Sequence, residues 1–392
     1  MRVLYATPRP PWPPHEGDQV IAWEQLRRLG GRCELSLLTL DTELEDEGAL
    51  RRALAPHCRE VHVLRGGRDR RRALRTLWNG LPMLVNLYWD RSLARQVDEV
   101  VRRLQPDLVH AQTIHMAEYF RDLALPRTID LVDPLSLNVR RRAELARLPR
   151  SLVYRAEAEL LRRYEERVLP GWSRVIVVSL DDVSPRPGVA LRGNPQGTHV
   201  TPELLAAHPA PEPRELALVF HGTMRYYSNV DAAVWFAREP FPRLRERHPG
   251  LQLYLVGRNP VPEVRALEGP GVVVTGAVDD VIPYLRRVQV GVYPLRAGTG
   301  IKFKVIEALA CGLPCVLSPT ALQGFDQVRA PEHVLVASDA DAWVEQVDRL
   351  LRDADLRERL GRAGQAAIEG HYSWERNAER LLEVWEEAVS RP

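Results

Sequence analysis

Short hydrophobic runs alternate with longer amphipathic stretches along most of the chain. An apolar run of about four to eight residues predicts a buried strand, and apolar positions spaced three or four apart predict a helix, as at Val20–Leu29 and Leu93–Leu104. This alternation indicates βα units and a parallel sheet rather than a sandwich. The expected strands are Val3–Ala6, Leu35–Leu40, Val61–Leu64, Leu108–Ala111, Ile129–Val132, Val175–Val178, Leu216–Phe220, Leu251–Val256, Val272–Thr275, Val290–Pro294, Cys315–Leu317 and Val334–Ala337.

The pattern occurs twice and predicts two doubly wound α/β domains. Between the halves, Ser184–Gly188 through Pro209–Pro213 is rich in Pro and Gly, and little regular structure is expected there because proline lacks an amide donor. We expect a first Rossmann-like domain over 1–190, a second over 191–370 and a terminal helix over 371–392. Because such sheets bind ligands at the carboxyl ends of their strands, we expect the site in the loops there and in a cleft between the domains.

Composition adds little beyond excluding some classes of protein. The 392 residues carry 54 basic and 52 acidic side chains, a formal charge of +2 that argues against nucleic-acid binding through overall charge. Four cysteines without a C-x-x-C pair argue against a disulfide framework or a zinc site and indicate a reducing compartment. No apolar run approaches the length of a membrane span, and the Pro-rich start is unlike a signal peptide. We expect a cytoplasmic protein.

The best candidate for chemistry is the loop and helix at residues 295–316, which follow an expected strand. Gly298 and Gly300 let the backbone approach an anion, and the helix that follows offers unpaired amides and the positive end of its dipole. Lys302 and Lys304 are the only two lysines in the chain, and an ammonium group is a compact phosphate-binding charge. The pattern predicts a diphosphate site.

Glu307 falls inside that helix, one turn after Lys304. A carboxylate there can accept hydrogen bonds from a ribose diol, as the acidic residue of dinucleotide folds does. The alternative is an ion pair with Lys304 at i, i+3.

At this point the sequence resembles the retaining glycosyltransferases of family 4, also called group 1. Residues 304–316 look like that family's Glu-Ala-x-Ala-x-Gly-x-Pro-Val signature, with Glu307 matching the glutamate that grips the ribose. Residues 219–224, 274–280 and 371–375 support the match. The resemblance implies the two-domain GT-B fold, two Rossmann-like domains facing a cleft, and a last helix that crosses back to the first domain.

Two departures from the family pattern affect the donor site. Thr299 stands where the family has a second glutamate, which contacts the donor sugar. The usual Gly-Arg…Lys pair for the diphosphate is also absent, because Thr223 follows Gly222 and Ser228 or Asn229 stands near the lysine position. Lys302 and Lys304, with Arg225 or Arg258, would then supply the charge, and the loop Gly298, Thr299, Gly300, Ile301 would supply backbone amides. This loop resembles a subgroup common in bacterial surface-polysaccharide pathways, often described as exosortase-associated sugar transferases.

In the first domain, the Pro-rich loop after the first strand carries Gly17 and Asp18 at the position of the family's acceptor and phosphate loop. Gly17 can bring a backbone amide close to the leaving phosphate, although a plain loop with an acidic helix start is the simpler interpretation. Related enzymes have a donor-sugar histidine after the fourth strand. The alignment leaves His110, Gln112 and His115 open, and a histidine at a strand end is often structural. Asp133 follows the next strand and is a candidate contact for acceptor hydroxyls.

Two Asp-x-Asp triplets, 339–341 and 353–355, resemble the metal-binding pair of other glycosyltransferases, but each precedes an amphipathic run where aspartate is a good N-cap. We expect no metal ion and no cofactor. The basic run 65–75, followed by apolar and aromatic residues through Trp89, would suit a membrane surface, or a solvated helix face beside the core. No Gly-x-Gly-x-x-Gly follows the first strand, which argues against a dinucleotide oxidoreductase.

These observations predict transfer of a sugar from a nucleoside diphosphate sugar to an acceptor hydroxyl, with retention and metal independence implied by the resemblance. The expected partners are a nucleotide-sugar donor and a saccharide or lipid-linked acceptor of cell-surface polysaccharide or glycolipid synthesis, with peripheral membrane contact and no nucleic acid. The alternatives are a nucleotide-sugar 2-epimerase of the same fold and a non-catalytic nucleotide-sugar-binding protein.

Overall fold

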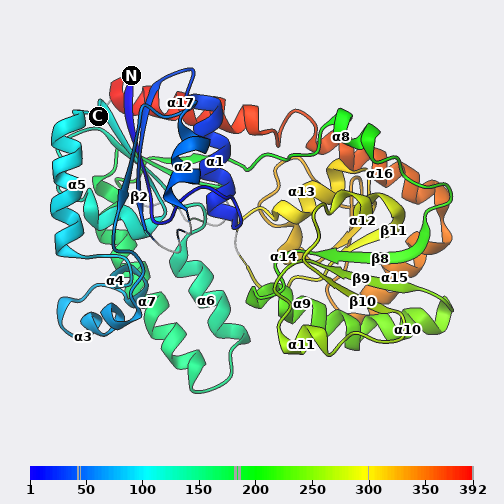
Figure 1. Ribbon diagram of the computed structural model, residues 1–392. Helices are drawn as coiled ribbons and strands as arrows, with labels where there is room; N and C mark the ends of the chain where they lie inside the picture. Colours follow the sequence, from blue (N-terminus) through cyan, green and yellow to red (C-terminus); the bar gives the residue numbers. More distant parts are fainter. Residues whose placement is uncertain (42–43, 45, 181–182, 184–186, 299, 391–392) are drawn as a thin grey trace. The chain divides into compact units, whose positions relative to one another are not determined.

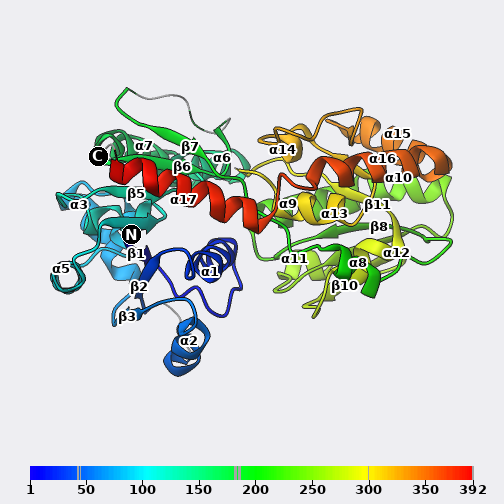
Figure 2. The same cartoon turned by 90° about the horizontal axis from the view of Figure 1, so that it is seen from above.

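The structure is a computed structural model that describes residues 1–41, 44, 46–180, 183, 187–298 and 300–390. The chain divides into two compact units (Figures 1 and 2). Unit 1 comprises Met1–Gln196 and Trp374–Pro392, and unit 2 comprises Gly197–Ser373. None of the helices in the described part of the chain has both the length and the apolar character needed to span a bilayer.

Unit 1 is built on a seven-stranded parallel sheet of order β3-β2-β1-β4-β5-β6-β7, which reverses between β1 and β4. Its strands are β1 (Arg2–Thr7), β2 (Glu34–Leu40), β3 (Glu60–Leu64), β4 (Leu108–Gln112), β5 (Arg127–Asp130), β6 (Arg174–Val177) and β7 (Leu191–Gly193). Its helices are α1 (Gly17–Leu29), α2 (Glu47–Leu54), η1 (Arg70–Arg75), α3 (Thr76–Asn79), α4 (Met83–Asn86), α5 (Arg91–Leu104), η2 (Ile114–Tyr119), α6 (Leu135–Leu145), α7 (Arg150–Val168), η3 (Leu169–Gly171) and α17 (Trp374–Ser390).

Strand β1 explains why the expected strands are apolar without alternation. Leu4 and Ala6 point into one core cluster, whereas Val3 and Tyr5 point into another, so both faces of the sheet are buried. The second cluster includes Trp385 of α17, which thus packs in unit 1 although it follows unit 2 in sequence. The side chain of Gln25 in α1 donates to Asn377 of α17 at 3.1 Å.

Unit 2 repeats the same winding in a six-stranded parallel sheet of order β10-β9-β8-β11-β12-β13. Its strands are β8 (Glu215–His221), β9 (Gln252–Val256), β10 (Val272–Gly276), β11 (Val288–Tyr293), β12 (Cys315–Leu317) and β13 (Leu335–Val336). Its helices are α8 (Pro202–Ala207), α9 (Tyr227–Arg238), α10 (Pro240–Arg247), α11 (Pro262–Arg265), α12 (Ile282–Arg287), α13 (Phe303–Ala310), α14 (Pro319–Leu322), α15 (Ala340–Arg352) and α16 (Ala354–Ile368).

The predicted α/β architecture is confirmed, and each of the twelve expected strands overlaps a strand of the structure. One expectation was wrong. The Pro-rich stretch between the halves contains β7, which pairs in parallel with β6, and the short helix α8. Strand β7 was missed because a three-residue strand at a sheet edge leaves no hydrophobic run to recognise.

Candidate active site

In unit 2 the strand order reverses between β8 and β11, and the loops after these two strands hold the predicted donor residues. This is the position at which doubly wound sheets bind ligands. Helix α9 follows the β8 loop and α13 follows the β11 loop, so two helix N-termini begin here. The converging backbone amides favour an anion.

The backbone around Gly222 is closely packed and depends on glycine. Gly222 has φ of 144° and Gly257 has φ of 148°. A Cβ atom on Gly257 would lie 1.9 Å from the carbonyl oxygen of Gly222. The amide of Met224 donates to the Arg258 carbonyl at 2.9 Å, which joins the two loops. These contacts hold the chain after β8 in one conformation.

Lys304 reaches from the first turn of α13 to this loop. Its ammonium group donates to the side-chain oxygen of Asn229 and lies 5.3 Å from the centre of the Phe220 ring. A Cβ atom on Gly222 would lie 3.1 Å from the same ammonium group. Burial, together with the charge of Lys302, lowers the pKa of Lys304 to about 7. The site therefore holds a cation that lacks a carboxylate partner among its described contacts, as an anion site requires.

Lys302 is buried, and its ammonium group donates to the carbonyl of Gly300. Gly298 and Gly300 have φ of 125° and 67°, which glycine accommodates without strain. A Cβ atom on Gly298 would lie 3.9 Å from the hydroxyl oxygen of Ser228, so this loop adjoins the first turn of α9. Both lysines thus border the same pair of loops.

Glu307 is held by a residue outside the predicted set. The Nε2 atom of His221 lies 3.1 Å from a carboxylate oxygen of Glu307, and its Nδ1 atom lies 3.0 Å from the hydroxyl of Tyr293. Burial raises the pKa of Tyr293, so its hydroxyl stays protonated and can donate to Nδ1. In that arrangement the imidazole proton on Nε2 points to Glu307.

The alternative ion pair between Glu307 and Lys304 is not among the contacts of the described residues. Because His221 holds one carboxylate oxygen, the carboxylate has a fixed orientation and retains acceptor capacity for a ligand.

The other predicted donor residues vary in position. Ile301 is buried beside Lys302, and Thr223 is half-buried, with its carbonyl accepting from the Asn229 amide at 2.9 Å. Arg258 is half-buried and Arg225 is exposed. Thr299 lies outside the described residues.

In unit 1 the order reverses between β1 and β4, and the predicted Gly17 and Asp18 begin α1 just after β1. Arg9 forms an ion pair with the Asp18 carboxylate, with one N–O distance of 2.7 Å. The side-chain amide of Gln112 at the end of β4 donates to the Asp18 carbonyl at 2.8 Å. Nothing lies within 4 Å of a Cβ atom built on Gly17, so the space beside its Cα atom is open.

The backbone immediately after β4 and β5 is strained. Thr113 has φ of 65° and Val132 has φ of 61°, a region that β-branched residues rarely adopt. The amide of Val132 donates to the Asp130 carboxylate at 2.8 Å, and the amide of Thr113 donates to the Asp130 carbonyl at 2.6 Å. Strain of this kind clusters at functional sites.

The structure separates the two candidate histidines. His110 is fully buried, and its Nδ1 atom accepts from the indole N–H of Trp385 at 3.1 Å. Burial lowers the pKa of His110 to about 3. The placement of His110 as a catalytic residue is therefore corrected to a packing role between the sheet and α17.

His115 is half-buried after β4, and its ring lies 4.5 Å from the ring of Tyr88. Burial lowers its pKa to about 4, so it stays neutral at physiological pH. A neutral imidazole here can donate or accept a hydrogen bond, which makes His115 the histidine that fits a substrate contact.

Asp133 is half-buried just before α6, so it follows the strained Val132. Its neighbour Asp130 is buried, and burial raises the pKa of Asp130 to about 7. Asp130 supports the backbone of this loop, whereas Asp133 stands where an acceptor contact was predicted.

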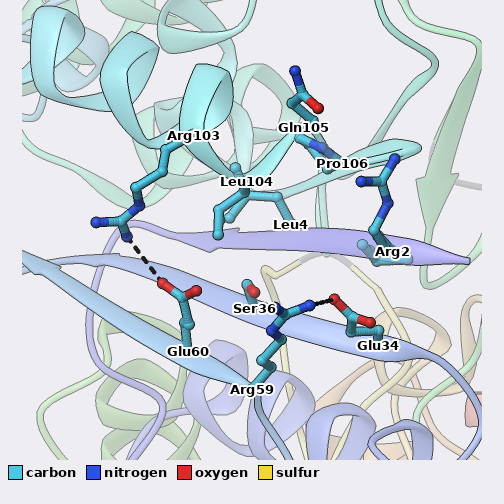
Figure 3. A pocket seen from close by; sticks show the side chains of 11 residues that line it. Arg2, Leu4, Glu34, Ser36, Arg59, Glu60, Arg103, Leu104, Gln105 and Pro106 are labelled. Atoms are coloured by element: carbon cyan, nitrogen blue, oxygen red, sulfur yellow. Dashed lines mark hydrogen bonds and ion pairs between the residues drawn. The ribbon is translucent and has the colours of Figure 1, made fainter.

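A cavity of about 280 Å³ opens at the amino ends of strands β1, β2 and β3 of unit 1 (Figure 3). Its charged side chains are paired, as Arg103 is with Glu60 at 2.9 Å and Arg59 is with Glu34. It offers no unpaired charge for a phosphate.

The two Asp-x-Asp triplets are confirmed as helix caps. Asp339 accepts from the amide of Ala342 at the start of α15, and Asp353 accepts from Leu356 at the start of α16. Within the described ranges, no three His, Cys, Asp or Glu side chains gather as metal ligands would.

Comparison with known proteins adds independent information about unit 2. Residues 215–353, from β8 through α15, match the model of the family described as glycosyl transferases group 1. The chain carries a group 1 glycosyltransferase domain. The phosphatidyl-myo-inositol mannosyltransferase of Mycobacterium leprae is 32% identical over 157 residues, which are 38% of this chain and 41% of that protein. The chain matches less than half the length of this relative and of two further curated relatives.

Solved structures show the same fold over the length of the chain. Sucrose-phosphate synthase from Thermosynechococcus elongatus superposes with a TM-score of 0.72 at 18% identity, covering 100% of both chains. Anabaena HepE in complex with UDP and glucose gives 0.65 at 14% identity, over 98% of this chain and 99% of that one. The expected GT-B fold is thereby confirmed.

Proposed function

We propose that this protein transfers a sugar from a nucleoside diphosphate sugar to an acceptor hydroxyl. The observation that carries the proposal is the pair of loops after β8 and β11, where Lys304 reaches the Gly222 loop and His221 orients Glu307. The match of residues 215–353 to group 1 glycosyltransferases supports it independently.

In this proposal the residues of unit 2 bind and stabilise the leaving nucleotide. Glu307 accepts from the ribose diol, and the ammonium groups of Lys302 and Lys304 neutralise the diphosphate as the anomeric C–O bond breaks through an oxocarbenium-like state. Amides of Gly298, Gly300 and Ile301 add hydrogen bonds. These charges supply the electrostatic stabilisation that a cation would otherwise provide, so the proposed reaction requires no metal ion. Retention of configuration is part of the proposal through the family resemblance.

In unit 1, Gly17 offers a backbone amide to the phosphate, His115 contacts the donor sugar and Asp133 contacts the acceptor hydroxyls. The Arg9–Asp18 ion pair fixes the start of α1 and so the direction of the Gly17 amide. Because His115 is neutral, it positions a hydroxyl by hydrogen bonding and does not place a positive charge beside the oxocarbenium-like centre.

The proposed acceptor is a saccharide or a lipid-linked saccharide of cell-surface polysaccharide or glycolipid synthesis, reached from the cytoplasmic side. The name of the Mycobacterium leprae relative states a phosphatidylinositol acceptor, and the HepE structure contains UDP and glucose. Both support a nucleotide-sugar donor and a hydroxyl-bearing acceptor for this chain.

The test begins with nucleotide binding. UDP, GDP, dTDP and ADP, each with EDTA, are added to the wild-type protein and to Lys302→Ala, with Arg238→Ala on the exposed end of α9 as a control for loss of one charge. A ligand at about a hundred times its dissociation constant stabilises the folded state by about 2.7 kcal/mol. We expect a shift in Tm with one nucleotide that survives EDTA and is reduced in Lys302→Ala alone.

The second step uses the matching nucleotide sugar with acceptor mixtures and follows the products. A new glycoside supports the proposal. An epimerised donor without acceptor would establish the epimerase, and binding without turnover would establish a sensor; either result overturns the proposed transfer. A shift that appears only with a divalent cation would overturn metal independence.

A further inference from the structure

Two segments of unit 1 carry its most exposed apolar side chains: residues 65–78 and the α6–α7 turn, residues 140–155. The five large hydrophobic residues with the greatest exposure in the described chain all lie on them, each at least 58% exposed: Leu74, Leu77, Trp78, Leu148 and Leu152. Single exposed apolar residues are ordinary, but this gathering indicates a contact surface.

The same two segments are strongly basic. Each contains six arginines and one acidic residue, so the rest of the chain carries a net negative charge. Arg70, Arg71, Arg147 and Arg150 are exposed, whereas Arg72 and Arg75 lie 3.5 and 3.7 Å from the Asp90 carboxylate. Exposed apolar side chains surrounded by arginines fit a surface that presents both anions and hydrocarbon.

Both segments lie on the side of the unit 1 sheet where its strands end. Residues 65–78 follow β3, and α6 follows β5; all strands of this sheet are parallel, so both segments leave from its carboxyl edge. Figure 1 shows α3 and the α6–α7 turn at the lower end of unit 1.

Helix α7 connects the two segments through buried carboxylates. Glu157 accepts from the amides of Met83 and Leu84 at 3.0 and 2.9 Å, which anchors the start of α4 just after residues 65–78. Glu165 accepts from the amide and hydroxyl of Ser136 at 3.0 and 2.7 Å, which anchors the start of α6. Because both anchors are on one helix, the two segments have a fixed relation within unit 1.

The elements that carry this surface also lead to the loops proposed to contact the substrates. Tyr88, which follows α4, places its ring 4.5 Å from the ring of His115. Asp133 lies two residues before the start of α6. A ligand held on this surface would therefore lie on the side of the sheet that carries the loops proposed to contact the substrates.

We propose that residues 65–78 and the α6–α7 turn together bind the surface of an anionic lipid bilayer. Arginine guanidinium groups contact lipid phosphates, and Leu77, Trp78, Leu148 and Leu152 enter the headgroup region, where tryptophan is favoured. A second copy of the chain fits this surface poorly, because two such basic surfaces would repel each other. This proposal rests on the proposed function, because it places the acceptor in a lipid bilayer, but the two are tested separately.

The experiment measures sedimentation of the whole protein with vesicles of phosphatidylcholine alone or mixed with phosphatidylglycerol. Two double variants remove the apolar tips: Leu77→Ser with Trp78→Ser, and Leu148→Ser with Leu152→Ser. Arg70→Glu reverses one charge on the surface, and Arg102→Glu makes the same change on the last turn of α5, at the amino ends of the strands. Val389→Ser on α17 is the control for loss of an exposed apolar side chain.

We expect binding to the mixed vesicles only, weakening as salt is raised. Each tip variant should bind more weakly and their combination should not bind, whereas Arg102→Glu and Val389→Ser should bind as the wild type does. Because loss of one arginine alone weakens binding roughly fivefold, the charge reversal in Arg70→Glu should weaken it by more than that. Unchanged Tm and nucleotide binding in the tip variants would show that they are folded.

Wild-type protein that fails to sediment with mixed vesicles, or tip variants that bind as the wild type does, would overturn the inference. Tip variants that turn a dimer into a monomer without vesicles would assign the surface to a second copy instead. Because these readouts need no donor or acceptor, failure of vesicle binding is distinguishable from failure of sugar transfer.

Discussion

The two sheets have the same winding, but the residues at the carboxyl ends of their strands differ in kind. At the carboxyl ends of the unit 2 strands, Lys304 is a half-buried cation whose described hydrogen-bond partner is the neutral Asn229. At the carboxyl ends of the unit 1 strands, Arg9 forms an ion pair with Asp18. The distinctive feature there is the strained backbone at Thr113 and Val132. A shared topology thus places the loops in both units, whereas the residues in the loops decide the chemistry that we propose for each: an anion site in unit 2 and hydroxyl contacts in unit 1.

The largest effect is expected where the unit 2 edge depends on backbone packing. Gly257→Ala would place a Cβ atom 1.9 Å from the Gly222 carbonyl oxygen at a φ of 148°, so we expect a loss of stability of more than about 3 kcal/mol, measured by denaturant unfolding. Gly250→Ala is the matched control, because it also has positive φ but meets nothing within 4 Å. Equal stability of the two variants would contradict the close packing.

The next largest effect is expected on nucleoside diphosphate affinity when a cation is removed from unit 2 rather than from unit 1. Lys304→Met keeps the hydrophobic stem and removes the charge, and a charge-assisted hydrogen bond of about 1.5–3 kcal/mol corresponds to a loss of about tenfold or more in nucleoside diphosphate affinity. Arg9→Met should lower that affinity less, because Arg9 already pairs with Asp18 and would act on the phosphate only through the orientation of the Gly17 amide. Calorimetric titration measures both, and comparable losses would mean that unit 1 shares the diphosphate charge.

The pH dependence distinguishes the edges by a different property. Because the pKa of Lys304 is lowered to about 7 and the diphosphate binds its protonated form, affinity should fall about tenfold per pH unit above that value, with proton uptake on binding. The pKa of His115 is lowered to about 4, so unit 1 should add no transition between pH 5 and 8.

Titration between pH 7 and 9 in two buffers of different ionisation enthalpy measures the proton uptake. Lys304→Met should give a weaker and flatter profile. An unchanged slope in that variant would assign the transition to another group.

A smaller effect should isolate the support of Glu307. Tyr293→Phe leaves the Nδ1 atom of buried His221 without its hydroxyl partner, a change of about 1 kcal/mol, so UDP affinity should fall about fivefold. Inorganic diphosphate has no ribose, and its affinity should be unchanged in Tyr293→Phe and in Glu307→Gln. Parallel loss of both ligands would show that these residues hold the loop and not the ribose.

The smallest change in stability is expected at Gly17. Nothing lies within 4 Å of a new Cβ atom there, so Gly17→Ala should leave the free energy of unfolding within about 1 kcal/mol of the wild type. If its amide approaches the leaving phosphate, the rate of transfer should fall while Tm stays constant. Unchanged kinetics would remove Gly17 from the proposed machinery.

The sequence by itself determined the local elements and most of the unit 2 edge. Apolar runs such as Val3–Ala6 predict strands because both faces of a parallel sheet are buried, and the glycine and lysine spacing of residues 298–307 is a local signal for an anion. The same reasoning recognised Asp339 and Asp353 as helix caps, since capping is decided within one turn.

The tertiary structure alone decided which side chains meet across the chain. The indole N–H of Trp385 donates to the Nδ1 atom of His110, which lies 275 residues away in the sequence. This contact makes a candidate catalytic histidine part of the core. His221, 86 residues before Glu307, holds that carboxylate, and Asn229 meets Lys304, although no periodicity indicates either pair. Sequence patterns record burial and backbone preference one element at a time, whereas such pairings depend on which strands become neighbours in the sheet.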